Sequence, residues 1–228
     1  MLDLQGLLIL ESVYLQQINN FTQFLMSSIV RINESFDFIS GDVQHKGFRS
    51  VCFYLLNTSD EMALPVSKID PALCDHIIVG HALIGPESLL WFQHPESNTE
   101  KLHELNTLKK KNPNLKILLS IRMGQSKVNS MNEFNILAAE EKRNQFVGSL
   151  IDLVSLYNLD GVDFFRLHQN ETKYQESKSD LVSLLKLTRK ECLRKGKLDT
   201  LLTATVSAHP DIASKFYNIT ELVRALII

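Results

Sequence analysis

From residue 48 onward, the chain alternates short, continuous apolar runs with longer amphipathic stretches. The runs are rich in Ile, Leu, Val and Phe, and each has the length of one β-strand. They are "SVCFYLL" (50–56), "HIIVGHALI" (76–84), "LKILLSI" (115–121), "GVDFF" (161–165) and "LLTATV" (201–206). Because they are apolar at nearly every position rather than at every second one, they predict strands that are buried on both faces, as in a parallel sheet.

Three amphipathic stretches between these runs predict helices over 98–112, 133–159 and 178–196. The first ends before Pro113, and the last begins at a Ser/Asp cap and closes with basic residues and Gly196. Strands that alternate with helices indicate βαβ units, so both a doubly wound sheet and a (β/α)-barrel fit the pattern. No glycine-rich phosphate-binding motif follows any of the strands, and a nucleotide-binding fold therefore has no support.

Residues 1–47 differ from the rest of the chain. The apolar positions of 1–30 predict an amphipathic helix, which the polar linker "NESFDFISGDVQHKG" follows. The stretch opens with an acid and is interrupted by Glu11 and several Gln and Asn residues. It is therefore too polar to span a bilayer, and it lacks the basic start of a secretion signal. We expect an N-terminal helical extension over 1–47 and an α/β domain over 48–228.

Composition excludes several classes of partner. The 228 residues are 44% hydrophobic and 22% charged, and the net charge is 24 − 26 = −2, which is typical of a globular chain with no general affinity for nucleic acid or anionic membranes. The three cysteines have no zinc-binding spacing, so we expect neither a metal nor a cofactor. Five N-x-[ST] sequons occur, and Asn57, Asn170 and Asn218 are the candidate N-glycosylation sites within the α/β domain.

The stretch "LDGVDFFRL" (159–167) resembles the D-G-x-D-x-D-x-E signature of the family 18 glycoside hydrolases, which are the chitinases and their inactive chitinase-like relatives. Four further segments resemble the same family, in the same order: "VCFYLLN", "IDPALCDHIIVGHALIG", "LNTLKKKNPNLKILLSI" and "LLTATVSAHPDIASKFYNITELV". Together they cover residues 48–226. The resemblance implies a TIM-type (β/α)₈ barrel, with the signature at the C-terminal, catalytic end of its strand.

The resemblance also implies a partial barrel, because only the first five of the family's eight strands are recognisable. Five strands cannot close such a barrel. We therefore expect "SVCFYLL" and "LLTATV" to be open edges that invite self-association, since neither run carries a charge or a proline to protect it.

The family hydrolyses β-1,4-linked N-acetylglucosamine polymers by a substrate-assisted route, in which a Glu protonates the leaving oxygen and an Asp orients the attacking acetamide. Carried over to this chain, Asp160, Gly161 and Asp163 match the start of the signature. Phe165 takes the place of the third Asp, and Leu167 takes the place of the acid Glu. Leucine cannot donate a proton, so we expect no catalytic residue, and we assign Asp160 and Asp163 to folding, as acceptors of backbone N–H groups.

The aromatic residues that hold sugars in the family are also replaced. Asn57 stands for the Trp after the first strand, Val79–Ala82 for Y-A-F-A, 122–124 (Arg-Met-Gly) for G-G-W, and Arg166 for the Trp of D-W-E. The chain's single tryptophan, Trp91, is predicted to pack on a hairpin rather than to form a sugar platform. Sugar binding, if retained, should therefore be weak.

The resemblance further implies a disulfide between Cys52 and Cys74, which leaves Cys192 as a free thiol. It also implies an extracellular or secretory location, although the N-terminus carries no convincing signal peptide. Our hypothesis is an inactive chitinase-like protein that binds chitooligosaccharides weakly or binds a protein partner. The alternative is a fragment of a chitin-hydrolysing enzyme whose missing strands complete the active site, and a third reading is a truncated relic with no selected function.

Overall fold

The structure is a computed structural model that describes residues 7–11, 24–29, 49–56, 64–85, 89–92, 94–123, 139–166, 178–207 and 210–227. Its strands are β1 (Leu7–Glu11), β2 (Phe24–Ile29), β3 (Arg49–Leu55), β4 (His76–Ile84), β5 (Leu90–Trp91), β6 (Lys116–Arg122), β7 (Gly161–Arg166) and β8 (Leu201–Ser207). Its helices are the 3₁₀ turn η2 (Val66–Lys68), α1 (Pro95–Leu108), α3 (Glu140–Leu156), α4 (Asp180–Arg194), α5 (Pro210–Phe216) and α6 (Ile219–Ile227).

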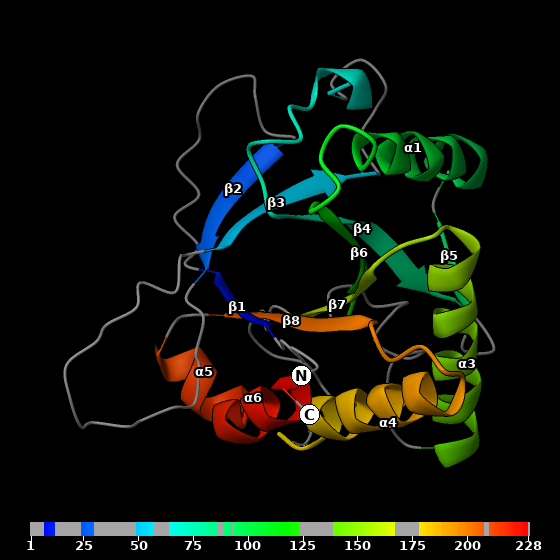
Figure 1. Ribbon diagram of the computed structural model, residues 1–228. Helices are drawn as coiled ribbons and strands as arrows, with labels where there is room; N and C mark the ends of the chain where they lie inside the picture. The colour runs from blue at the N-terminus through cyan, green and yellow to red at the C-terminus, as the bar shows by residue number, and fades with distance from the viewer. Residues whose placement is uncertain are drawn as a thin grey trace.

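The strands form one curled sheet in the order β1-β8-β7-β6-β4-β3-β2, with β5 paired to β4 outside this path. All neighbours are parallel except β2 on β3 and β5 on β4. The five predicted runs are β3, β4, β6, β7 and β8, which lie side by side in chain order, and the helices lie outside the curl (Figure 1). A doubly wound sheet reverses its strand order and carries helices on both faces. The sheet is thus a curled half-barrel, consistent with the predicted partial barrel, and the doubly wound alternative is wrong.

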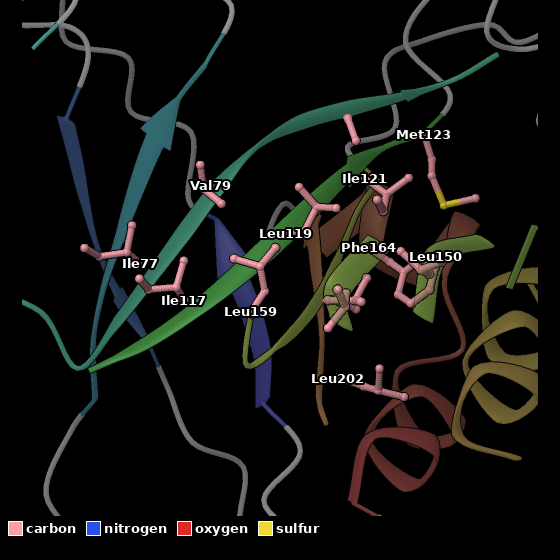
Figure 2. Close-up of a cluster of buried hydrophobic side chains, with 14 of the residues drawn as sticks. Ile77, Val79, Ile117, Leu119, Ile121, Met123, Leu150, Leu159, Phe164 and Leu202 are labelled. Atoms are coloured by element: carbon pink, nitrogen blue, oxygen red, sulfur yellow. The ribbon is translucent and has the colours of Figure 1, made fainter. Parts of the chain in front are cut away.

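The sheet buries both of its faces, which explains why its strands are apolar at successive positions. Between the sheet and the helices lies a large core, which includes Ile77, Val79, Ile117, Leu119 and Phe164 (Figure 2). A smaller cluster fills the inside of the curl and contains Val51, Phe53, Ile78, Leu118 and Phe165. The alternation of these two sets along each strand determines which residues can reach the interior of the barrel.

The predicted N-terminal helix is wrong for the described residues, because Leu7–Glu11 and Phe24–Ile29 are strands. β1 pairs in parallel with β8, and β2 pairs antiparallel with β3. Short apolar runs such as "LLIL" suit a helix or a strand equally well when judged by periodicity. Here the edge strands β8 and β3 offer backbone hydrogen bonds that only another strand can use. These bonds favour strands over a helix at residues 7–11 and 24–29.

The same pairings contradict the expectation that "SVCFYLL" and "LLTATV" are open edges. The N-terminal segment supplies a neighbour for each of them, and β1 and β2 lie close together at the open side of the curl (Figure 1). No ladder joins these two strands within the described residues. Self-association through β3 and β8 therefore requires that β1 or β2 first be displaced.

The disulfide that the family resemblance implied is present. Cys52 in β3 is bonded to Cys74, which lies shortly before β4, and both are buried. Cys192 is free and buried in α4, as expected. A cross-link that closes a loop with a sequence separation of 22 residues stabilises a fold by roughly 3 kcal/mol in chain-entropy estimates.

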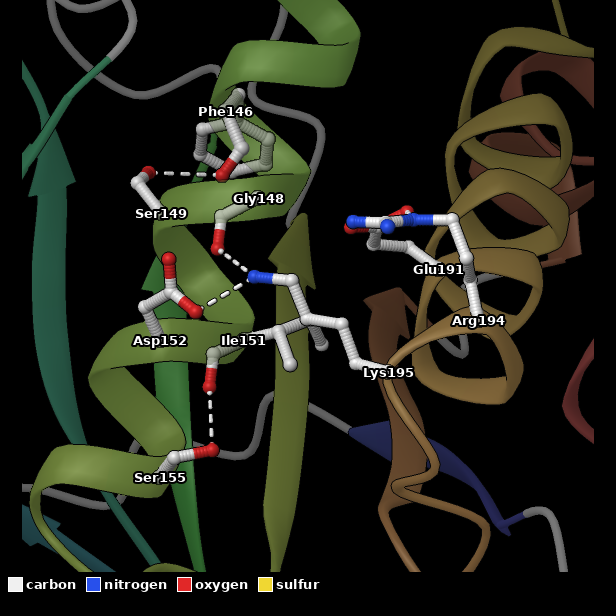
Figure 3. A network of polar contacts seen from close by, with 9 residues as sticks. All are labelled: Phe146, Gly148, Ser149, Ile151, Asp152, Ser155, Glu191, Arg194 and Lys195. Atoms are coloured by element: carbon white, nitrogen blue, oxygen red, sulfur yellow. Dashed lines mark hydrogen bonds and ion pairs between the residues drawn. The ribbon is translucent and has the colours of Figure 1, made fainter.

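Polar contacts join α3 to α4 on the outside of the barrel (Figure 3). The Lys195 ammonium donates to the carbonyl of Gly148 at 3.2 Å and to the carboxylate of Asp152 at 2.5 Å. Because the Asp152 side chain is 72% exposed, this ion pair contributes only about 0–1 kcal/mol. None of the helices that the structure describes has the length and apolar character needed to cross a membrane.

The pairing of β1 with β8 can be tested with a double proline substitution. In a strand paired on one side, alternate N–H groups face the partner, so Ile9→Pro combined with Leu10→Pro removes at least one donor. We expect this full-length variant to dimerise or aggregate with rising concentration and to unfold at a lower temperature, by about 2–4 °C for each kcal/mol lost. Size-exclusion chromatography and thermal unfolding measure both effects.

The matched control is Gln16→Pro combined with Gln17→Pro, which places the same residues between the two strands in sequence. It should stay monomeric. If the Ile9/Leu10 variant behaves like this control, β1 does not protect the β8 edge.

Candidate functional site

The candidate site lies at the C-terminal end of the parallel strands. Because β3, β4, β6, β7 and β8 all run in the same direction, their last residues meet at one end of the curl (Figure 1). In (β/α)-barrels this end carries the chemistry. We call it the mouth and define it by five described residues at or near the ends of these strands: Leu55, His81, Arg122, Phe165 and Ser207.

Asp160 does not lie at the mouth. It precedes β7 and is therefore at the opposite end of the sheet, so the expectation that the whole stretch "LDGVDFFRL" sits at the catalytic end is wrong for this residue. Its carboxylate accepts the N–H of Ile117 at 2.8 Å and forms ion pairs with Lys109 at 2.5 Å and Lys116 at 3.8 Å. These contacts hold the start of β7 against β6, in keeping with a folding role.

Gly161 allows β7 to approach β8 closely. A Cβ atom at this position would lie 2.1 Å from the carbonyl oxygen of Leu201, which is far inside van der Waals contact. A side chain would force the two strands apart. The Gly of the signature is therefore needed for the sheet itself.

Asp163 is fully buried inside the curl, and side-chain hydroxyls surround it. Its carboxylate accepts hydrogen bonds from Thr203 at 2.8 Å, from Thr205 at 3.0 Å and from Ser120 at 3.1 Å. The sequence prediction named backbone N–H groups as its partners and missed these three residues. Thr203 and Thr205 are two residues apart on a strand and share a face, which is the one signal that could have revealed them.

His81 extends this network toward the mouth. Its Nδ1 lies 2.9 Å from the Ser120 hydroxyl oxygen. Since Ser120 donates its proton to Asp163, Nδ1 carries the hydrogen that is shared with Ser120. Burial, aided by the positive charge of Arg122, lowers the pKa of His81 to about 4. The imidazole is therefore neutral near pH 7.

Phe165, at the position of the family's third Asp, points into the curl. Its ring centroid is 4.4 Å from that of His81, with the two rings tilted, and 6.3 Å from that of Phe53, with the two rings edge-on. With 8% exposure it completes the inner apolar cluster. A hydrophobic ring thus stands where the family pattern has a carboxylate. Leu167, at the acid position, lies outside the described residues, as do Asn57 and Gly124.

The two arginines of the altered wall lie on different faces. Arg122 ends β6 on the same side as Leu118 and Ser120, so it belongs to the inner face of the mouth, where it is partly exposed. Burial lowers the pKa of its guanidinium, which remains charged. Arg166 is adjacent to Phe165 and therefore faces the helices, where it is buried.

Trp91 lies on the β4–β5 hairpin beyond the mouth. It pairs in register with Leu83, and a Cβ atom on Gly85 would lie 2.8 Å from the indole Cδ1. The indole thus packs over a glycine of the hairpin, as the sequence predicted. It is nevertheless 44% exposed, which leaves part of the ring open to a ligand.

The sequon residue Asn218 is exposed at the start of α6, where its side-chain oxygen accepts the N–H of Glu221 at 3.3 Å. This contact caps the helix and leaves the amide nitrogen, to which a glycan is attached, on the surface. Asn57 and Asn170 lie outside the described residues.

Comparison with known proteins identifies relatives for most of the chain. The sequence profile "Glycosyl hydrolases family 18" matches residues 49–226. Chitinase-3-like protein 2 from Homo sapiens is 28% identical over 183 residues, which are 78% of this chain and 46% of that protein. The group IV chitinase of Ostrinia furnacalis superposes with a TM-score of 0.67 at 28% identity, covering 77% of this chain and 48% of that one. Human YKL-39, described as a pseudo-chitinase with retained chitooligosaccharide binding, superposes with a TM-score of 0.64 at 26% identity and the same coverage. The chain thus spans about half the length of these relatives.

The neutral state of His81 makes stability depend on pH. Its pKa is about 4 in the fold and 6.5 ordinarily, so between these values the unfolded chain binds a proton that the folded chain does not. The stability that the neutral His81 contributes to the fold is fully present above pH 6.5. It falls as the pH drops and is lost near pH 4. It amounts to at most about 3 kcal/mol.

Chemical unfolding between pH 4 and 7 should therefore show a steeper fall in stability for the native chain than for the variant His81→Phe, which cannot titrate. The difference between the two curves isolates this histidine from the other six. Parallel curves would show that His81 titrates normally in the fold.

Proposed function

The chain belongs to the glycosyl hydrolases of family 18, and we propose that it is a catalytically inactive member that binds chitooligosaccharides weakly. The observation that carries this proposal is Phe165, whose buried ring packs on His81 and Phe53 at the place of a catalytic carboxylate. Leu167 at the acid position adds to it, because loss of a general acid alone costs about 10²- to 10⁴-fold in rate.

The remaining acid of the signature supports the same conclusion. Asp163 is held by Ser120, Thr203 and Thr205 below the mouth, where it is fully buried. A carboxylate surrounded by hydroxyl donors is stabilised as an acceptor, and it is not accessible to a sugar in this arrangement. Its role is therefore to hold three strands together.

Loss of catalysis together with retained sugar binding is described for a relative of this chain. Human YKL-39 is described as a pseudo-chitinase that retains chitooligosaccharide binding. The alternative, a hydrolase whose acid comes from sequence beyond the matched half-barrel, is favoured by the similarity to the Ostrinia furnacalis chitinase. Measured turnover separates the two.

Trp91 is the residue we assign to sugar binding. Pyranose rings stack on aromatic faces, and this indole is 44% exposed and packs against Gly85 of its hairpin. The other aromatic residues that hold sugars in the family are replaced in this chain. A single aromatic platform, Trp91, should therefore give only weak affinity for an oligosaccharide. Binding of a protein partner instead of a sugar is the alternative for the same surface.

The disulfide bears on where the protein matures. Disulfides persist in oxidising compartments, so the Cys52–Cys74 bond supports maturation in the secretory pathway and an extracellular location. The exposed sequon at Asn218 is compatible with this route.

The purified full-length chain should show no turnover of a fluorogenic chitobioside. The double variant Phe165→Asp with Leu167→Glu should remain well below an active chitinase, because Arg122 still occupies the mouth. Turnover by the unmodified chain would favour the hydrolase alternative.

Trp91 is the chain's only tryptophan. Titration with chitohexaose should change the intrinsic fluorescence, which reports on this one residue, and give a dissociation constant in the high-micromolar to millimolar range. Calorimetry should detect the same binding and lose it in Trp91→Ala. Leu89→Ala, which changes another exposed apolar residue next to the hairpin, is the control that should keep it.

A further inference from the structure

The charge of the mouth differs from the family pattern. Phe165 and Leu167 replace two carboxylates, and Arg122 replaces a glycine. Two acidic groups are removed and one positive charge is added, so these positions are more positive than the pattern. A change of this size alters which ligands a site attracts.

Arg122 places its charge at the C-terminal end of β6, on the inner face of the mouth. The N–H of Met123 donates to the carbonyl of Phe165 at 2.9 Å, which joins the end of β6 to the end of β7. Arg122 is itself in register with Phe165 and lies on the inner face. Its charge disfavours protonation of His81, so its field reaches the inside of the mouth.

The buried acid lies below this level. Asp163 pairs in register with Ser120, two residues before Arg122, which is about 7 Å deeper along the strand. Its hydrogen bonds come from hydroxyls of β6 and β8. Above it, the neutral imidazole of His81 and the ring of Phe165 form an uncharged floor.

Arg122 and Trp91 are aligned across three neighbouring strands. Ile121 pairs with Ala82 in β4, and the next residue of β4, Leu83, pairs with Trp91 in β5. Two strand spacings separate the two backbones, which is about 10 Å. An oligosaccharide that stacks on the indole can therefore bring a neighbouring unit to the guanidinium.

We propose that the ligand of this mouth is an acidic oligosaccharide, whose carboxylate or sulfate group binds Arg122 while a neighbouring sugar ring stacks on Trp91. The guanidinium presents planar, paired N–H donors that match both kinds of oxyanion. The partly buried position strengthens the interaction relative to an exposed lysine. This inference rests on the proposed sugar-binding function and narrows its ligand class.

The test titrates the full-length chain, followed by Trp91 fluorescence and by calorimetry, with three hexasaccharides. Chitohexaose is neutral, a hyaluronan hexasaccharide carries carboxylates only, and a heparin-derived hexasaccharide carries sulfates as well. At low ionic strength the acidic ligands should bind at least about tenfold more tightly than the neutral one, as one charge-assisted hydrogen-bond pair provides. The two acidic arms identify which oxyanion is preferred.

In Arg122→Gln the ratio of acidic to neutral affinity should fall about tenfold, and in Arg122→Lys it should fall less, because the bidentate geometry is lost but the charge is kept. Lys110→Gln is the control for non-specific polyanion binding. It removes the same charge from an exposed position after α1, at the opposite end of the strands. Thermal unfolding of each variant checks the fold.

The outcomes separate this inference from the proposed function. Chitohexaose binding without a preference for acidic ligands overturns the inference and leaves the proposed function standing. Equal losses in Arg122→Gln and Lys110→Gln also overturn it, since binding would then follow net charge alone. If no hexasaccharide changes the fluorescence or gives heat, both the sugar-binding function and the inference are wrong.

Discussion

The carboxylate of Asp163 has to be hydrogen-bonded, because it lies at zero exposure inside the curled sheet. Leaving such a group without partners in a low-dielectric interior costs several kcal/mol. Ser120 from β6 and Thr203 and Thr205 from β8 supply the partners, so one side chain of β7 ties three adjacent strands together. The interior of this half of the barrel is organised around that requirement. It explains why an acid of the family signature persists in a chain that we propose is inactive.

His81, Phe165 and Arg122 lie nearer to the mouth than Asp163 and influence one another. The family pattern has a Phe at position 81 and an Asp at position 165, whereas this chain has His81 and Phe165, whose rings are in contact. The apolar aromatic residue thus stands at the other of these two positions. His81 remains neutral because it is buried and because Arg122 is near. A packed neutral floor with one cation beside it differs in chemistry from a row of carboxylates, even though the backbone that carries it is the same.

The segment outside the family match has a structural role at both edges of the sheet. β1 and β2 occupy the backbone positions that β8 and β3 would otherwise expose. Exposed, uncharged edge strands favour aggregation, and covering them is a common solution in natural proteins. Here a stretch of chain without family resemblance performs this task for a sheet that belongs to the family.

The sequence by itself determined the elements that repeat a strong local pattern. The five apolar runs became β3, β4, β6, β7 and β8 almost residue for residue, because strands buried on both faces admit few polar residues. The quoted segments also determined the family, the disulfide partners and the loss of the acidic positions 165 and 167. Only the tertiary structure decided the rest. It showed that Asp160 lies at the far end of β7, that hydroxyls rather than backbone groups hold Asp163, and that residues 7–11 and 24–29 are strands. Each of these depends on contacts between segments far apart in sequence, and local periodicity carries no information about such partners.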